Sequence, residues 1–197
     1  MKKRIKEYWN KLKAEYENNY KENIFKNYEQ TVPVFKKFRN FLNELLNKYP
    51  TNVEVICILA SVELELGYQE TAIKLLEDFI LKYKDVINDI DKARIYTNLG
   101  FYHEFGEKQG EYLLEAEKLN SPFVETYKGL ALTYFSNYEN DKATEDLYKS
   151  LKYFEKALKI TNDYEIYFGY AVCLFETKQY QKAKEIFEEL LLEYPNR

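Results

Sequence analysis

Residues 164–195 read YEIYFGYAVCLFETKQYQKAKEIFEELLLEYP, and this stretch decides the fold. Its apolar residues recur at the i, i+3, i+4, i+7 spacing of a helix with one buried stripe, first from Ile166 to Leu174 and then from Ala183 to Leu191. Residues 177–180 interrupt the pattern, and Pro195 ends it. The stretch therefore predicts two amphipathic helices that fold back on each other.

The same stretch resembles a tetratricopeptide repeat, whose pattern is W-x2-L-G-x2-Y, then A-x3-F, then P. A Tyr stands where the pattern has Trp and an Ala where it has Gly, and both replacements keep the sizes similar. In pattern order the matched positions are Tyr167, Tyr170, Ala171, Leu174, Ala183, Phe187 and Pro195. In such repeats each hairpin leaves an apolar face that only its neighbour covers.

Further hairpins of this kind are expected upstream, which predicts four repeat-like units at about 53–86, 89–120, 121–160 and 163–195. Leu99-Gly100 reproduces the L-G of the pattern. Ser121 is expected to cap the third unit, with Pro122 as its first helical residue. With the N-terminal pair, the resemblance implies an all-α, right-handed α-α superhelix of about ten helices in five antiparallel hairpins.

The third unit departs from the pattern because its second helix begins late. The extra residues lie within 137–148 and form either a longer loop or additional turns of helix. Insertions in solenoids lie at one edge and often serve binding. We expect a tolerated surface insertion here and keep a binding role as the alternative.

Residues 1–50 are interpreted as an atypical N-terminal segment. Apolar residues every three or four positions predict one long helix from Lys3 to Gln30, which includes Ile24 and Tyr28. Thr31-Val32-Pro33 is expected to break it, and Val34–Tyr49 to form the return helix. This segment holds 12 Lys and Arg against 6 Asp and Glu, although the whole chain has a net charge of −4. A basic arm either packs on its own acidic body, which we favour, or steers an acidic partner.

Composition indicates a folded protein, with 46% hydrophobic and 31% charged residues. The 20 Tyr and 13 Phe suit the wide gaps between stacked hairpins, although an AT-rich genome would also enrich Tyr. Cys57 and Cys173 are interpreted as reduced core thiols. No signal peptide or apolar stretch of membrane-spanning length is found. We expect a cytoplasmic, bacterial protein.

Little in the sequence indicates catalysis. His103 is the single histidine, and it replaces the Tyr that the repeat pattern has after Leu99-Gly100, so we interpret it as a packing residue. A histidine-based metal site needs more than one such ligand, and no glycine-rich phosphate loop occurs. We therefore predict no enzymatic activity, no catalytic residue, no metal site and no cofactor. Nucleic-acid binding is unfavourable because most of the chain is acidic.

In the family that this chain resembles, first-helix residues line an inner face that binds extended or helical peptides. Transferred to this sequence, the resemblance implies a groove that is apolar in its C-terminal half. Only Asn98 matches the Lys, Asn and Arg set that grips a C-terminal carboxylate in some members, with Lys128 nearby. Glu104 also falls on the inner face. The predicted groove residues are Arg94, Asn98, Phe101, Lys128, Leu132, Phe135, Phe168, Val172 and Phe175.

The resemblance thus implies a protein- or peptide-binding scaffold. The alternatives are a cytoplasmic chaperone for a hydrophobic or secreted substrate, and a peptide-sensing regulator. Another part of the chain filling the groove is an equally weighted expectation. Solenoid ends normally carry a polar cap, and the last hairpin has none after Pro195, which favours a homodimer.

Overall fold

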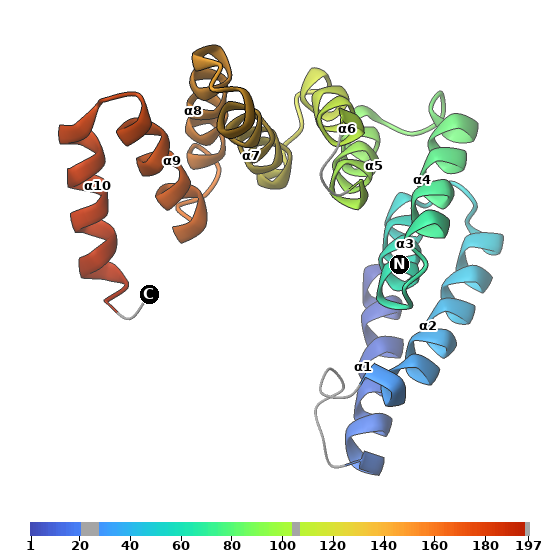
Figure 1. The fold of residues 1–197 in the computed structure, drawn as a ribbon. Helices are drawn as coiled ribbons and strands as arrows, with labels where there is room; N and C mark the ends of the chain where they lie inside the picture. The colour runs from blue at the N-terminus through green and yellow to red at the C-terminus, as the bar shows by residue number, and fades with distance from the viewer. Residues whose placement is uncertain (21–27, 104–106, 196–197) are drawn as a thin grey trace. The chain divides into compact units, whose positions relative to one another are not determined.

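The computed structural model describes residues 1–20, 28–103 and 107–195, and every regular element in these ranges is an α-helix (Figure 1). The chain divides into two compact units, Met1–Ile95 and Tyr96–Arg197, each described here by itself. The helices are α1 (Lys2–Tyr20), α2 (Tyr28–Lys48), α3 (Val53–Glu65), α4 (Gln69–Tyr83), α5 (Asp89–Tyr102), α6 (Glu107–Lys118), α7 (Val124–Asp141), α8 (Thr144–Leu158), α9 (Tyr164–Glu176) and α10 (Tyr180–Glu193).

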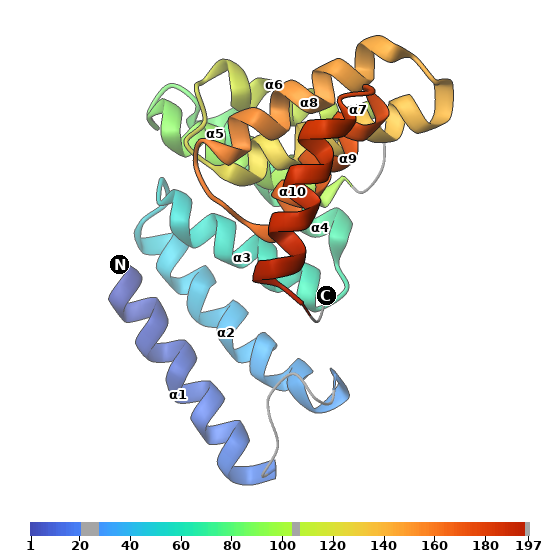
Figure 2. The same cartoon turned by 90° about the vertical axis from the view of Figure 1, so that its left-hand side faces the viewer.

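The first unit begins with α1 lying along α2 (Figure 2). Ile5, Leu12 and Tyr16 of α1 are buried, and the ring of Tyr8 stacks on Phe41 with 4.0 Å between the ring centroids. These residues follow the predicted helical stripe, so the hydrophobic effect holds α1 against α2. Successive pairs α2–α3 and α3–α4 continue the packing.

The N-terminal boundaries differ from the sequence prediction. α1 ends at Tyr20, and residues 28–30 belong to α2, so a single helix from Lys3 to Gln30 is wrong. The predicted position Ile24 lies outside the described residues. Pro33 does not separate two helices but lies inside α2. As the sixth residue of α2 it lies beyond the four N-terminal N–H groups that lack intrahelical partners, so the helix forgoes one internal hydrogen bond there. The Thr31 hydroxyl donates to the Tyr28 carbonyl at 2.7 Å.

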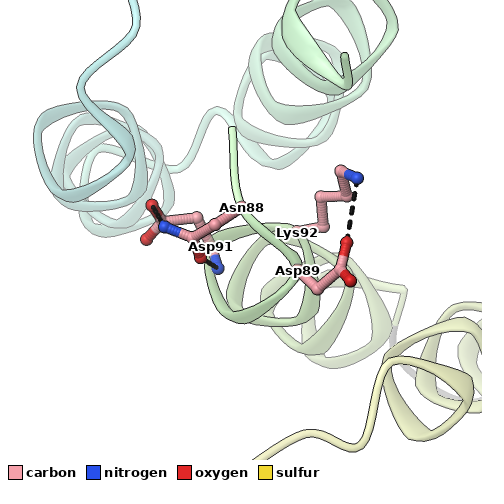
Figure 3. Close-up of polar contacts among 4 residues, drawn as sticks. All are labelled: Asn88, Asp89, Asp91 and Lys92. Carbon is pink, nitrogen blue, oxygen red and sulfur yellow. Dashed lines mark hydrogen bonds and ion pairs between the residues drawn. The ribbon is translucent and has the colours of Figure 1, made fainter. Parts of the chain in front are cut away.

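Helix α5 begins with a reciprocal side-chain cap (Figure 3). The backbone N–H of Asp91 donates to Asn88 Oδ1, and Asn88 Nδ2 donates to Asp91 Oδ2, both at 2.9 Å. Lys92 Nζ reaches Asp89 Oδ1 at 3.0 Å. The cap satisfies a backbone donor that has no partner within the helix, and the two aspartates suit the positive end of the helix dipole.

The second unit is packed around Leu113, Leu130, Leu147 and Phe154, all buried. Small residues let its helices approach closely. A Cβ built at Gly100 would lie 2.6 Å from Leu113 Cγ, and one built at Gly129 would lie 2.7 Å from Leu113 Cδ1. The glycine of the Leu99-Gly100 motif therefore makes room for a leucine of α6.

The start of α7 corrects a second prediction. The helix begins at Val124 after Phe123, two residues later than a Ser121 cap would place it. Ser121 is buried, accepts from the Phe123 N–H at 3.2 Å and lies 2.6 Å from Thr126 Oγ1. Thr126 Oγ1 lies 2.7 Å from Thr97 Oγ1 in turn. The Ser121 hydroxyl thus belongs to a buried network that links α5 to α7.

The insertion at 137–148 forms additional helix, one of the two predicted alternatives. α7 has 18 residues, whereas α9, the first helix of the next hairpin, has 13. Lys142 then takes the left-handed conformation with φ 55° and donates its N–H to the Tyr138 carbonyl. α6 has only 12 residues, so α7 is the longer helix of the adjacent pair α6–α7.

Tyrosines connect the helices of the second unit through carboxylates. Tyr153 donates to Glu117 at 3.1 Å, Tyr170 to Glu155 at 3.3 Å and Tyr167 to Glu189 at 3.2 Å. Burial, and then the adjacent carboxylate, raises the pKa of each of the three phenols. Aromatic residues therefore fill the gaps between helices and place their polar ends at the surface.

Candidate functional site

The predicted groove residues are distributed over both units. Arg94 is exposed on the part of α5 that belongs to the first unit, and the others belong to the second. Glu104 lies outside the described residues. We call the set from the second unit the first-helix face. Its members are Asn98, Phe101, Lys128, Leu132, Phe135, Phe168, Val172 and Phe175.

Apolar side chains of the first-helix face are strongly exposed. The exposed fractions are 38% for Phe101, 48% for Leu132, 44% for Phe168 and 52% for Phe175, whereas Phe135 and Val172 are half-buried. The rings are held by neighbouring aromatics. The ring of Phe168 lies 5.7 Å from that of Phe187, and the ring of Phe175 lies 5.2 Å from that of Tyr180. Such side chains are positioned for contact with an apolar surface.

Two polar contacts align α7 with α9 along this face. Lys128 Nζ pairs with the Glu165 carboxylate, and Tyr138 donates to Glu176 Oε2 at 3.0 Å. On α7, Leu132 and Phe135 lie between these two contacts in sequence, and on α9 the residues from Phe168 to Phe175 do. The two helices thus run side by side in the same direction, with the apolar residues in the interval between the contacts.

The electrostatics of the first-helix face are nearly neutral. Lys128 is its single cation, and that charge is matched by Glu165, which is exposed on the adjacent helix. A ligand carboxylate would have to compete with Glu165 for Lys128. The residues of this face therefore favour apolar contacts over recognition of a terminal carboxylate.

A cleft of about 790 Å³ lies between α6 and α7. It shares Phe101 and Leu132 with the first-helix face. Beyond these two residues its walls combine the apolar side chains of Leu114, Leu130 and Tyr134 and the carboxylate of Glu111 with several small or uncharged polar residues. They include Gln109 and Gly110 from α6 and Thr133, Ser136, Asn137 and Asn140 from α7.

The sequence interpretation did not include this cleft, although the sequence carries a signal for it. Gly129, Thr133, Ser136 and Asn140 recur at spacings of four, three and four, which is one face of a helix. That stripe continues into the predicted insertion. These residues form a face of α7 that has no large apolar side chain, although α7 must still pack against its neighbour.

The histidine and the two cysteines have side chains that could take part in catalysis or metal binding. His103 stacks on Tyr112 with 5.4 Å between ring centroids, the contact of a packing residue. Cys57 and Cys173 are buried, as predicted, and neither forms a disulfide within the described residues. Burial raises the pKa of Cys173 to about 11. Among the residues that the structure covers, no group of three or more metal-ligating side chains occurs, and no helix is long and apolar enough to cross a membrane.

Comparison with known proteins shows which folds this architecture is similar to. Residues 128–197 match the family described as Tetratricopeptide repeat, and no curated protein matches the sequence. Among solved structures, MamA is 22% identical, with coverage of 83% of this chain and 90% of MamA and a TM-score of 0.60. TPR-like repeats from Podospora anserina are 13% identical over 95% of this chain and 92% of theirs, with a TM-score of 0.61.

Human IFIT1, solved as a dimer with m7Gppp-AAAA, is 15% identical, with coverage of 82% of this chain and 41% of IFIT1 and a TM-score of 0.59. Identities this low show the fold alone. That fold confirms the prediction of an all-α chain whose ten described helices pack as sequential hairpins of the tetratricopeptide type.

Proposed function

We propose that this chain, whose residues 128–197 match the family described as Tetratricopeptide repeat, is a non-enzymatic module that binds a protein or peptide through its first-helix face. Repeat proteins of this kind generally serve as interaction scaffolds. The two buried cysteines, which form no disulfide within the described residues, suit a reducing compartment, and we propose that the module acts in the cytoplasm.

The exposure of the aromatic side chains is the observation that carries this proposal. Phe168 and Phe175 lie on one helix, and about half of each side chain is in contact with solvent. Aromatic residues dominate the binding energy of protein interfaces because they bury a large area at low entropic cost. Phe101 and Leu132 extend the apolar surface to two further helices.

The proposal is tested with two phage-displayed libraries selected on the folded protein. One library presents random linear octapeptides, and the other presents random faces on a stable helical scaffold. We expect binders from at least one library and a loss of affinity of tenfold or more with Phe168→Glu/Phe175→Glu, since a charge at a buried contact costs more than about 1.4 kcal/mol.

Leu191→Glu/Leu192→Glu is the matched control. Both leucines are exposed on α10, at 64% and 85%, and neither belongs to the first-helix face. Binders that are lost with this control and retained with Phe168→Glu/Phe175→Glu would refute the proposal. Light scattering of the unliganded protein adds an independent criterion. A homodimer that dissociates with Phe168→Glu/Phe175→Glu would show that a second copy occupies the face.

A further inference from the structure

One face of α10 is exposed at positions where the equivalent face of α8 is covered by a helix. Both are second helices of hairpins, and Phe187 and Glu188 of α10 lie 33 residues after Phe154 and Glu155 of α8. In α8 these two residues meet the next helix. The Phe154 ring lies against a glycine of α9, and Glu155 accepts a hydrogen bond from a tyrosine of α9 at 3.3 Å. The equivalent face of α10 therefore has the register of a surface that receives a helix.

Four residues on this face, spaced four apart, form a row that we call the α10 ridge. They are Tyr180, Lys184, Glu188 and Leu192. Rows with this spacing are the ridges through which helices pack against one another. Tyr180 is 54% exposed and Leu192 85% exposed, and Lys184, Glu188 and the adjacent Leu191 are exposed as well. The α10 ridge thus leaves apolar area in water at both of its ends.

The order of side chains along the α10 ridge is complementary to its own reverse. Read from Tyr180 it runs apolar, positive, negative, apolar, and read from Leu192 the two charges are exchanged. A second copy of α10, laid antiparallel and centred on residue 186, therefore brings its Glu188 to Lys184 and its Lys184 to Glu188. Parallel pairing would bring like charges together, which is unfavourable. The charges thus select both the partner and its direction.

The two charges of the α10 ridge are already close to each other within one copy. Lys184 Nζ lies 3.6 Å from Glu188 Oε1. In the antiparallel pair each charge gains a second partner, so that four charges of alternating sign lie together. At each end Tyr180 would cover Leu192 of the second copy, and Leu191 would lie beside them. The contact uses the same surface on both copies, which is the twofold arrangement that closes a dimer.

We propose that the α10 ridge binds a second copy of this chain, with the two α10 helices antiparallel about a twofold axis at residue 186. A contact confined to two helices of 14 residues buries less than the roughly 1,200 Å² of standard interfaces, so the dimer is weak and forms at high protein concentration. No residue of the α10 ridge belongs to the first-helix face. The inference therefore goes beyond the proposed binding function and does not depend on it.

Charge reversal on the full chain tests the pairing, with sedimentation equilibrium as the measurement. Lys184→Glu places a negative charge against Glu188 of the second copy, and Glu188→Lys places a positive charge against its Lys184. We expect each single change to weaken dimerisation at least tenfold. Lys184→Glu/Glu188→Lys exchanges the two charges and keeps the ridge complementary to its reverse, so it is expected to restore the dimer.

A mixture of the two single variants separates specific pairing from damage to the fold. Lys184→Glu leaves two negative charges on the ridge and Glu188→Lys leaves two positive ones, so the mixed proteins are expected to form a heterodimer although neither pairs well with itself. Lys3→Glu is the matched control. It changes the net charge as Lys184→Glu does and breaks an exposed i,i+4 pair with Glu7 in α1, and it should leave the dimer unchanged. Thermal melts establish that each variant is folded.

Three results would overturn the proposal. They are a protein that stays monomeric at about 1 mM, a dimer that withstands the single charge reversals, and single variants that neither the double change nor mixing brings back together. A dimer that withstands the reversals but dissociates with Phe168→Glu/Phe175→Glu would place the second copy on the first-helix face instead. Both readouts are needed, because the Phe175 ring contacts that of Tyr180.

Failure of this inference can be told apart from failure of the proposed function. Leu191→Glu/Leu192→Glu is expected to abolish the dimer, because it places charges at the apolar ends of the α10 ridge. Peptides selected on the first-helix face should still bind this variant. A selection without binders would refute the binding function and leave the dimer standing, and a monomer that binds peptides would do the reverse.

Discussion

The ring of Phe154 lies against Gly169, where a Cβ would come within 2.5 Å of Phe154 Cζ. Gly169→Ala is therefore expected to destabilise the protein by about 2 kcal/mol, because overpacking a close contact costs more than the roughly 1 kcal/mol that alanine gains over glycine in a helix. Urea denaturation measures the change. Gly110→Ala is the control, since its Cβ would meet only Thr133 Cγ2 at the ordinary contact distance of 3.6 Å, so that the helix propensity of alanine raises stability. Equal stability changes for the two variants would contradict the packing described for α8 and α9.

The cap of α5 gives a second prediction. Asn88→Ala removes the acceptor of the Asp91 N–H and the donor to the Asp91 carboxylate. We expect the free energy of unfolding to fall by about 1 kcal/mol. Asn88→Ser restores an N-cap oxygen and is expected to recover most of the loss. Thermal unfolding followed by circular dichroism compares the three proteins, and full stability of Asn88→Ala would argue against the cap.

The thiol of Cys173 gives a prediction on reactivity. It is fully buried, and burial raises its pKa to about 11, so little thiolate exists at pH 8. We expect both cysteines to resist iodoacetamide in the folded protein and to react rapidly in 6 M guanidinium. Mass spectrometry of timed samples reads the outcome. Because the folded pKa is the higher one, Cys173 contributes stability below the unfolded pKa near 9, and this contribution is lost as pH rises towards 11.

The three phenols that are hydrogen-bonded to carboxylates give a prediction at alkaline pH. The pKa values of Tyr153, Tyr167 and Tyr170 are raised in the folded state. Above about pH 10 an unfolded chain loses these protons while the folded protein retains them, so stability falls as pH rises past 10. Tyr153→Phe is expected to cost about 1 kcal/mol at pH 7 through the lost hydrogen bond to Glu117 and to show a shallower alkaline decline. Denaturation between pH 8 and 11 measures both effects.

Most helices could be predicted from the sequence, because the spacing of apolar residues alone is enough to indicate a helix. The Leu99-Gly100 motif indicated the first helix of a repeat. The structure shows why a glycine is needed there, because the Leu113 side chain approaches it closely. The same rules were wrong where tertiary contacts compete with them. Serine is a residue type that commonly caps helices, yet the Ser121 hydroxyl shares a hydrogen bond with the Thr126 hydroxyl. Proline is a residue type that commonly marks a helix boundary. The buried residues on both sides of Pro33, Thr31 and Phe35, nevertheless belong to one helix.

The candidate site, too, could be predicted from the sequence only in part. The spacing of the repeat pattern selected exposed side chains such as Phe168 and Phe175, because a residue on a helix face can be placed from its neighbours in sequence. The cleft could not be predicted in this way, since it depends on where α7 ends. That end is made by Lys142 in the left-handed conformation, a position that glycine or asparagine usually fills, so the sequence carries no conventional stop signal there.

The length of α7 also bears on how the binding preference of this chain can change over evolutionary time. Asn137 and Asn140 are exposed and contribute nothing to the packed interior, so their replacement costs little stability. Residues such as Leu113 and Leu130, by contrast, are fixed by the core that they fill. Related proteins are therefore expected to differ most at the exposed residues in the last turns of α7, while the residues that fill the core stay the same.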